Sequence, residues 1–87
     1  MKVDYHSNFV KHYRERIAPN HTLVKEFQDT LSLFLEEPDN PVLDDHLLKD
    51  EKTGWRSFSI TGDMRVVYKR IKDGILFYDI GTHAQVY

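Results

Sequence analysis

The chain has 87 residues, a formal net charge of −2 and a hydrophobic fraction of 40%. This length provides material for one hydrophobic core, so we expect residues 1–87 to form a single domain. The absence of cysteine excludes a disulfide scaffold and a thiolate zinc site. The sequence contains no apolar run of membrane-spanning length and no secretion signal, so we expect a soluble, cytoplasmic protein without a membrane partner.

Charge is distributed unevenly along the chain. Residues 36–51 contain seven acidic residues against one basic residue, whereas residues 52–87 contain six basic residues against three acidic ones. The C-terminal third therefore has a local charge of +3, which is compatible with contacts to a few phosphates. This charge falls short of the basic surface that by itself indicates nucleic-acid binding.

The first part of the sequence predicts a short strand followed by a helical hairpin. Residues 2–6 alternate enough for an edge strand, and Ser7 is a suitable N-cap for a helix that ends before Pro19. Thr22 is a suitable N-cap for a second helix, which ends before Pro38. Apolar residues recur in both helices at spacings of three to four, so each helix has one face that can pack on a sheet.

The second part predicts an irregular connection and then three strands. Residues 36–51 combine prolines with Asp and Asn, which favours a solvent-facing loop. After Gly54 the hydrophobic period becomes two, in segments rich in β-branched and aromatic residues, at 55–60, 64–70 and 75–80. The last two segments are separated by the Asp73-Gly74 dipeptide, which is typical of a type I′ hairpin turn. We therefore expect an α+β fold, in which an N-terminal helical hairpin packs on a small antiparallel β-sheet.

The strand pattern also predicts a register. A three-residue turn at 61–63 sets Phe58 opposite Val66 and Ile60 opposite Met64, which gives one apolar face for the helices. Arg65 then lies on the opposite face. A two-residue turn at 73–74 makes this opposite face partly apolar as well, through Val67, Ile71, Leu76, Tyr78 and Ile80.

Motifs for metal and cofactor binding are absent from the sequence. The five histidines show neither HExxH nor paired helical spacing, and there is no cysteine to support them. The chain also lacks the GxGxxG, GxxxxGK(S/T) and GxSxG patterns of dinucleotide, P-loop and serine hydrolase sites. We therefore expect no metal site and no cofactor.

A set of histidine, arginine and tyrosine residues remains as the candidate site. His46 lies in the acidic loop, Arg65 in the middle strand, and His83 and Tyr87 after the last strand. Metal-free RNA cleavage requires a base for the 2′-hydroxyl, an acid for the departing 5′-oxygen and a cation for the phosphorane. The spacing alone does not establish this chemistry, because surface histidines commonly only form hydrogen bonds and Arg65 could pair with an acid such as Asp79.

Four stretches of the sequence resemble the RelE/ParE superfamily of toxins and, within it, the YafQ-type branch. They are DHLL at 45–48, GWR at 54–56, DMRVVY at 63–68 and GTHAQVY at 81–87. The resemblance implies a RelE-like toxin fold and a growth-arresting toxin of a type II toxin-antitoxin system. Such toxins are ribosome-dependent mRNA interferases, metal-independent endoribonucleases that cut mRNA through the 2′-hydroxyl. The implied partners are the ribosome, mRNA and a cognate antitoxin protein.

The resemblance also implies which residues are catalytic. His46 matches the loop histidine, His83 the C-terminal histidine and Tyr87 the terminal aromatic residue of the YafQ type. Asp63 matches the turn aspartate of that type. Arg65 matches the strand arginine of YoeB-type relatives.

Three positions depart from the YafQ-type pattern. Ser59 stands in place of a histidine, Met64 in place of a tryptophan and Asp79 in place of an arginine. Because the arginine is an expected phosphate contact, Arg56 or Arg65 would have to compensate for its loss. The RNA-binding residues that we expect are Arg56, Lys69 and Trp55, the last as an aromatic residue suited to stacking on a base. The departures leave two alternatives open: a ParE-like toxin that binds a topoisomerase without RNase activity, and a decayed, non-toxic member that only binds an antitoxin.

Overall fold

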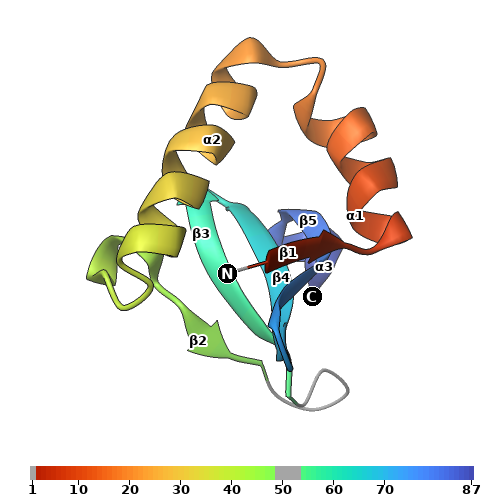
Figure 1. The fold of residues 1–87 in the computed structure, drawn as a ribbon. Helices are drawn as coiled ribbons and strands as arrows, with labels where there is room; N and C mark the ends of the chain where they lie inside the picture. The colour runs from red at the N-terminus through yellow and green to blue at the C-terminus, as the bar shows by residue number, and fades with distance from the viewer. Residues whose placement is uncertain (1, 49–53) are drawn as a thin grey trace.

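The computed structural model describes residues 2–48 and 54–87. The elements are β1 (Lys2–Tyr5), α1 (Ser7–His12), the π-helical η1 (Tyr13–Ile17), α2 (His21–Glu36), the 3-10 turn η2 (Pro41–Leu43), β2 (His46–Leu47), β3 (Arg56–Thr61), β4 (Met64–Ile71), β5 (Gly74–Thr82) and α3 (His83–Val86). The strands form one five-stranded sheet in the order β1-β5-β4-β3-β2. The helices α1 and α2 are connected at the top of Figure 1 and diverge toward the sheet.

Both predicted helices form, but the predicted N-caps are wrong. His6 caps α1 in place of Ser7, because its Nδ1 accepts a hydrogen bond of 3.0 Å from the backbone N–H two residues further on. Asn20 caps α2 in place of Thr22, and its side-chain oxygen accepts a hydrogen bond of 3.2 Å from the backbone N–H three residues further on. Asparagine is at least as good an N-cap as threonine, so the helix begins at the earlier position.

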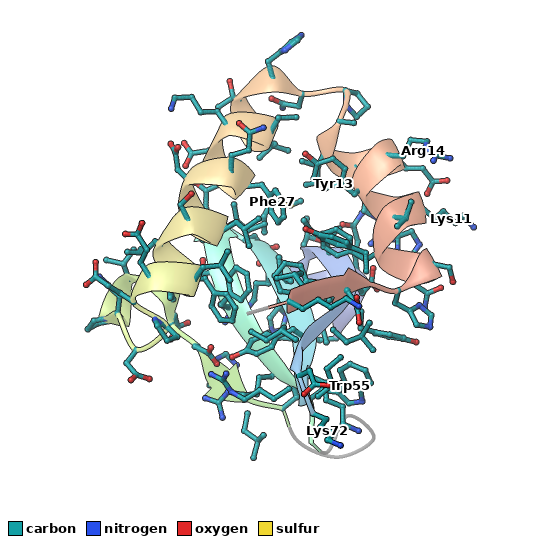
Figure 2. The ribbon with its side chains drawn as sticks, viewed as in Figure 1. Lys11, Tyr13, Arg14, Phe27, Trp55 and Lys72 are labelled. Carbon is teal, nitrogen blue, oxygen red and sulfur yellow. The ribbon has the colours of Figure 1, made fainter. Side chains whose placement is uncertain are left out.

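Aromatic side chains close the helical hairpin near its turn. Figure 2 shows Tyr13 and Phe27 pointing toward one another from the two helical segments, whereas Lys11 and Arg14 point away from them. The rings of Tyr13 and Phe27 meet nearly edge to face, with their centroids 5.3 Å apart. None of the helices in residues 2–48 and 54–87 has the length and apolar character needed to cross a membrane.

The connection after α2 is more regular than predicted over the residues that the structure describes. Residues 41–43 form the turn η2, whose Leu43 is fully buried. His46 and Leu47 form β2, an edge strand that pairs antiparallel with β3. A strand of two residues has too little periodicity to be recognised in a sequence. Residues 49–51 of the predicted loop lie outside the described residues.

The three predicted C-terminal strands form the antiparallel meander β3-β4-β5, and β1 pairs with β5 in parallel. The predicted pairing of Phe58 with Val66 is confirmed. The predicted pairing of Ile60 with Met64 is wrong, because an irregularity in β3 places Thr61 opposite Met64 instead. Such bulges shift the register by one residue and are not encoded in the alternation of apolar residues.

The turn between β4 and β5 consists of Lys72 and Asp73, so the predicted Asp73-Gly74 turn is wrong. Ile71 pairs with Gly74, which also lies opposite Lys2 of β1. A Cβ atom on Gly74 would lie 1.9 Å from the backbone oxygen of Lys2. Close packing of β1 therefore requires this glycine, and Gly74 does not adopt a positive φ.

Each face of the sheet carries a separate group of buried residues. The face opposite the helices holds Val67, as predicted, together with Val86 of α3, a helix that the sequence did not predict. Ile80, in contrast, belongs to the helix-facing core, because an extra residue in β5 at Tyr78 shifts the register. The helix-facing core consists of Phe9, Ile17, Phe27, Phe34, Leu43, Phe58, Ile60, Val66, Tyr68, Ile75, Phe77 and Ile80.

Replacing Phe34 by alanine tests this core. The Phe34 ring is 1% exposed, stacks on Phe58 at 4.4 Å and meets Tyr68 edge-on at 5.0 Å. We expect Phe34→Ala to lower the free energy of unfolding by about 3 to 5 kcal/mol in urea titrations followed by circular dichroism. The neighbouring Leu35→Ala, at a side chain 41% exposed, should cost less than about 1 kcal/mol. Equal losses would contradict the placement of Phe34.

Candidate active site

Arg65 in β4 is the centre of a polar cluster on the face of the sheet opposite the helices. Only 7% of Arg65 is exposed. Its Nε donates to Ser57 Oγ (2.9 Å), and its Nη2 donates to the backbone oxygens of Asp44 (2.7 Å) and Ser57 (3.3 Å). Its Nη1 donates to Asp44 Oδ2 at 3.3 Å. These contacts engage four of the five guanidinium N–H groups, so the buried charge is compensated.

His46 lies at the edge of this cluster because β2 pairs with β3. Its Nδ1 is 3.4 Å from Arg65 Nη2 and 3.1 Å from the backbone oxygen of Asp44. Arg65 has shorter contacts with other acceptors, so the carbonyl of Asp44 is the better partner for Nδ1. A proton on Nδ1 leaves Nε2 of a neutral His46 as a proton acceptor.

Tyr87 lies between the two predicted histidines. Its ring centroid is 4.2 Å from that of His83, in a nearly perpendicular arrangement, and 6.5 Å from that of His46. Its hydroxyl forms a hydrogen bond with Ser57 Oγ, the same atom that accepts from Arg65 Nε. The structure thus brings His46, Arg65, His83 and Tyr87 together.

The short helix α3 positions His83 and Tyr87. The Gln85 side chain accepts a hydrogen bond of 2.7 Å from the backbone N–H of Thr82, which completes a capping box. The backbone N–H of His83 donates to the backbone oxygen of Asp63 at 3.0 Å. Asp63 therefore contacts this helix through its backbone, at the turn between β3 and β4.

Two adjacent carboxylates hold the loop that carries His46. Asp44 adopts the left-handed conformation with φ 46°, which aspartate tolerates better than most residues. Asp44 reaches Arg65, whereas Asp45 accepts a hydrogen bond of 2.8 Å from Arg56 Nε and another from the Tyr68 hydroxyl. The loop is therefore attached to side chains from both faces of the sheet.

Arg56 and Tyr68 are perturbed by Asp45. The hydrogen bond to Asp45 raises the pKa of Arg56 further above its ordinary value. Burial, together with the hydrogen bond to Asp45, raises the pKa of Tyr68 to about 12. Arg56 also borders a cavity of about 310 Å³ that is lined by the acidic loop and Arg70. Arg56 is therefore not part of the cluster around Arg65.

Trp55 and Lys69, two predicted RNA-binding residues, contact each other instead of the Arg65 cluster. The ammonium of Lys69 lies 5.4 Å from the centroid of the Trp55 ring, a distance typical of a cation–π contact. The Trp55 ring packs on Tyr78 at 4.9 Å, and Tyr78 contacts His6 at 4.7 Å. Figure 2 shows Trp55 at the end of the molecule away from the helical turn.

Asp79 faces α1 and η1, so it is not the partner of Arg65 that the sequence suggested as one possibility. Its Oδ1 lies 2.5 Å from His12 Nδ1 and 3.7 Å from Arg16 Nη1. Arg16 Nη1 also donates to the backbone oxygen of Ile80 at 2.9 Å. These contacts fasten the first helical segment to the end of β5.

Sequence reasoning missed two residues of the site, Ser57 and Asp44. The signal for Ser57 was available, because the register of Phe58 with Val66 places Ser57 on the face of Arg65. The sequence carried no comparable signal for Asp44, whose contact depends on the path of the loop. Among the described residues, no three histidine, aspartate or glutamate side chains gather as possible metal ligands.

Comparison with known proteins identifies a matching family. The family described as "Bacterial toxin of type II toxin-antitoxin system, YafQ" matches residues 1–87 of this chain. No curated protein matches the sequence at a significant level.

Solved structures of toxins share the fold. A copper-bound mutant toxin from Helicobacter pylori has a TM-score of 0.81 and 23% identity, covering 100% of this chain and 99% of that one. YafQ from E. coli has a TM-score of 0.74 and 23% identity, covering 99% and 97% of the two chains. The E. coli DinJ-YafQ complex contains a chain with a TM-score of 0.73, 23% identity and the same coverage. The expected toxin fold is confirmed.

Removal of the Tyr68 hydroxyl tests the attachment of the loop. The pKa of Tyr68 is about 12 in the folded chain and about 10 in an unfolded one, so its stabilising effect is complete below pH 10 and is lost as the pH approaches 12. Tyr68→Phe should cost about 1.5 to 3 kcal/mol at pH 8.

The cost of Tyr68→Phe should shrink between pH 10 and pH 12, which urea unfolding at a series of pH values would measure. Tyr5→Phe is the control, because Tyr5 is 48% exposed, and it should change stability little at pH 8. A cost that stays constant up to pH 12 would contradict the raised pKa of Tyr68, and with it the burial and hydrogen bonding of the hydroxyl.

Proposed function

We propose that this chain, which belongs to the YafQ family of bacterial toxins of type II toxin-antitoxin systems, is an endoribonuclease. Its proposed substrate is mRNA on the ribosome. The observation that carries the proposal is a series of contacts that begins at the buried Arg65. His46 lies beside Arg65, the Tyr87 hydroxyl shares Ser57 Oγ with it, and the His83 ring packs on Tyr87. Two imidazoles and a guanidinium meet the requirements of RNA cleavage without a metal ion.

In the proposed reaction the RNA supplies its own nucleophile. Nε2 of His46 accepts the proton of the 2′-hydroxyl, and the 2′-oxygen attacks the adjacent phosphorus. The bond between phosphorus and the 5′-oxygen breaks, and protonated His83 donates a proton to this leaving oxygen. The products are a 2′,3′-cyclic phosphate and a 5′-hydroxyl end. Arg65 stabilises the additional negative charge of the phosphorane, and Asp63 positions His83 through its backbone oxygen.

Dependence on the ribosome follows from the weak cationic surface. Arg56 and Arg65 are each paired with a carboxylate of the loop, so the +3 charge of residues 52–87 is partly neutralised within the protein. Affinity for free RNA depends on the number of phosphates that basic residues contact. Lys69 and Trp55 are the proposed additional contacts, for a phosphate and a base respectively, and Arg56 is a third candidate at the edge of the loop. The ribosome has to supply the remaining binding energy.

Primer extension on a message in a translating extract tests this function. The wild-type protein should create new 5′ ends that disappear when ribosomes are omitted. His83→Ala and His46→Ala should each lower the cleavage rate by a factor on the order of 10² to 10⁴, because each removes a proton-transfer group. His21→Ala, at the exposed start of α2, is the matched control and should cleave normally.

The other outcomes separate the alternatives. Equal cleavage of naked RNA would contradict the ribosome dependence. Inactive wild-type protein would favour the topoisomerase-binding or decayed member, and full activity of His83→Ala would remove the proposed acid.

We further propose, by analogy with the DinJ-YafQ complex, that a cognate antitoxin binds this chain. The surface we propose for it is an apolar groove between the helical segments. The groove has a volume of about 390 Å³ and includes the exposed Val10 and Tyr5. Arg14 lines it as well, so an apolar segment with acidic flanks is the complementary partner.

Coexpression with the neighbouring gene tests this partner. The gene product should copurify with the wild-type chain and suppress its toxicity. Val10→Glu should abolish copurification, because it places a charge in the groove, and should leave cleavage unchanged. Leu35→Glu is the control, since Leu35 is 41% exposed, compared with 43% for Val10, and lies outside the groove. Copurification with Val10→Glu would contradict the groove as the binding surface.

A further inference from the structure

The buried hydroxyl of Ser57 connects two residues of the proposed active site. Ser57 is 0% exposed. Its Oγ accepts a hydrogen bond of 2.9 Å from Arg65 Nε and forms a second one with the Tyr87 hydroxyl. The connection runs from a buried cation in β4, through β3, to the end of the chain beyond α3.

The direction of these hydrogen bonds follows from the donors that are present. A guanidinium only donates, so Arg65 cannot accept the Ser57 proton. Within the described part of the chain, the hydrogen-bond partners of the Ser57 hydroxyl are Arg65 Nε and the Tyr87 hydroxyl. A buried hydroxyl proton without an acceptor costs free energy, so the Ser57 proton is donated to the Tyr87 oxygen. The Tyr87 proton therefore points away from Ser57.

We propose that Ser57 is a positioning residue that directs the Tyr87 hydroxyl proton toward the RNA phosphate. Tyr87 is 39% exposed, so a ligand can reach its hydroxyl. The cation strengthens the arrangement, because a hydroxyl that accepts from Arg65 becomes a better donor to the next group. Tyr87 then donates a hydrogen bond to a non-bridging phosphate oxygen. This role rests on the proposed endoribonuclease function.

The arrangement explains how a cation with little exposure can act on a substrate. Arg65 has one N–H group outside the hydrogen bonds described above, and only 7% of the residue is exposed. The charge of Arg65 therefore acts on the phosphate partly by polarising the hydrogen bonds through Ser57 and Tyr87. A donor of this kind contributes to catalysis when it is held in the orientation that the phosphorane requires.

A double-mutant cycle measures this coupling in single-turnover cleavage of ribosome-bound mRNA. Tyr87→Phe should lower the maximal rate by about 10² to 10³, with little change in the concentration dependence, because the donor acts in the transition state. Ser57→Ala should lower the maximal rate by a smaller factor, because the Tyr87 hydroxyl remains but loses its orientation. Ser57→Ala should have no further effect in the Tyr87→Phe background.

Ser59→Ala is the matched control for this cycle. Ser59 lies two residues after Ser57 in β3, and it is opposite Arg65 in the register. The Arg65 side chain does not form a hydrogen bond with Ser59. This variant should retain the wild-type rate. If the rate of the double variant falls by the product of the factors for Ser57→Ala and Tyr87→Phe alone, the two residues act independently and the proposal is overturned. Cleavage by Tyr87→Phe at the wild-type rate would also overturn it.

A measurement without RNA separates this inference from the proposed function. The Raman difference between wild type and Tyr87→Phe isolates the Tyr87 ring, and its tyrosine doublet distinguishes a hydroxyl that accepts from one that donates. We expect an accepting hydroxyl in the wild type, and loss of this signature when the difference is taken in the Ser57→Ala background. A donating signature in the wild type would overturn the hydrogen-bond direction. Failure of the proposed function would give a different result, because the wild-type protein would then cleave no RNA whatever the Raman spectrum shows.

Discussion

The burial of the Arg65 charge is the constraint on which the site depends. A guanidinium in the middle strand is tolerated away from water only if its N–H groups find acceptors. Two of these acceptors belong to Asp44, which fixes the loop, and two belong to Ser57, which fixes the contact with Tyr87. Compensation of one charge therefore orders a loop, a strand and the C-terminal residues together. The geometry of His46 follows, because His46 lies two residues after Asp44.

The adjacent residues Asp44 and Asp45 attach the loop to two different groups of side chains, which a single carboxylate could not reach at the same time. Asp44 contacts Arg65, and Asp45 contacts Arg56 and Tyr68. The left-handed backbone at Asp44 lets consecutive side chains reach in different directions. The loop is attached at two points just before His46, so its conformation depends on β3 and β4 more than on its own sequence.

Periodicity predicted the elements of this fold better than their ends or their register. The helical hairpin and the C-terminal meander follow from apolar spacing, and the pairing of Phe58 with Val66 follows from a short turn. The caps, the strand β2 and the irregularities beside Ile60 and Tyr78 depend on tertiary contacts that have no local signal. The grouping of His46 with Tyr87 therefore came from the chemistry of the side chains and the family resemblance and not from strand order, and the contact of Arg65 with Asp44 had no signal of either kind.

The departure at Asp79 from the YafQ-type pattern bears on the proposed binding of RNA. A carboxylate there pairs with His12 and Arg16, so it binds the first helical segment to β5 instead of offering a cation to a phosphate. Two further arginines are also paired, Arg65 with Asp44 and Arg56 with Asp45. This internal neutralisation stabilises the fold and leaves little charge for free RNA. In the proposed reaction, recognition of the substrate therefore relies on its placement by the ribosome, and the protein contributes mainly oriented donors and acceptors around Tyr87.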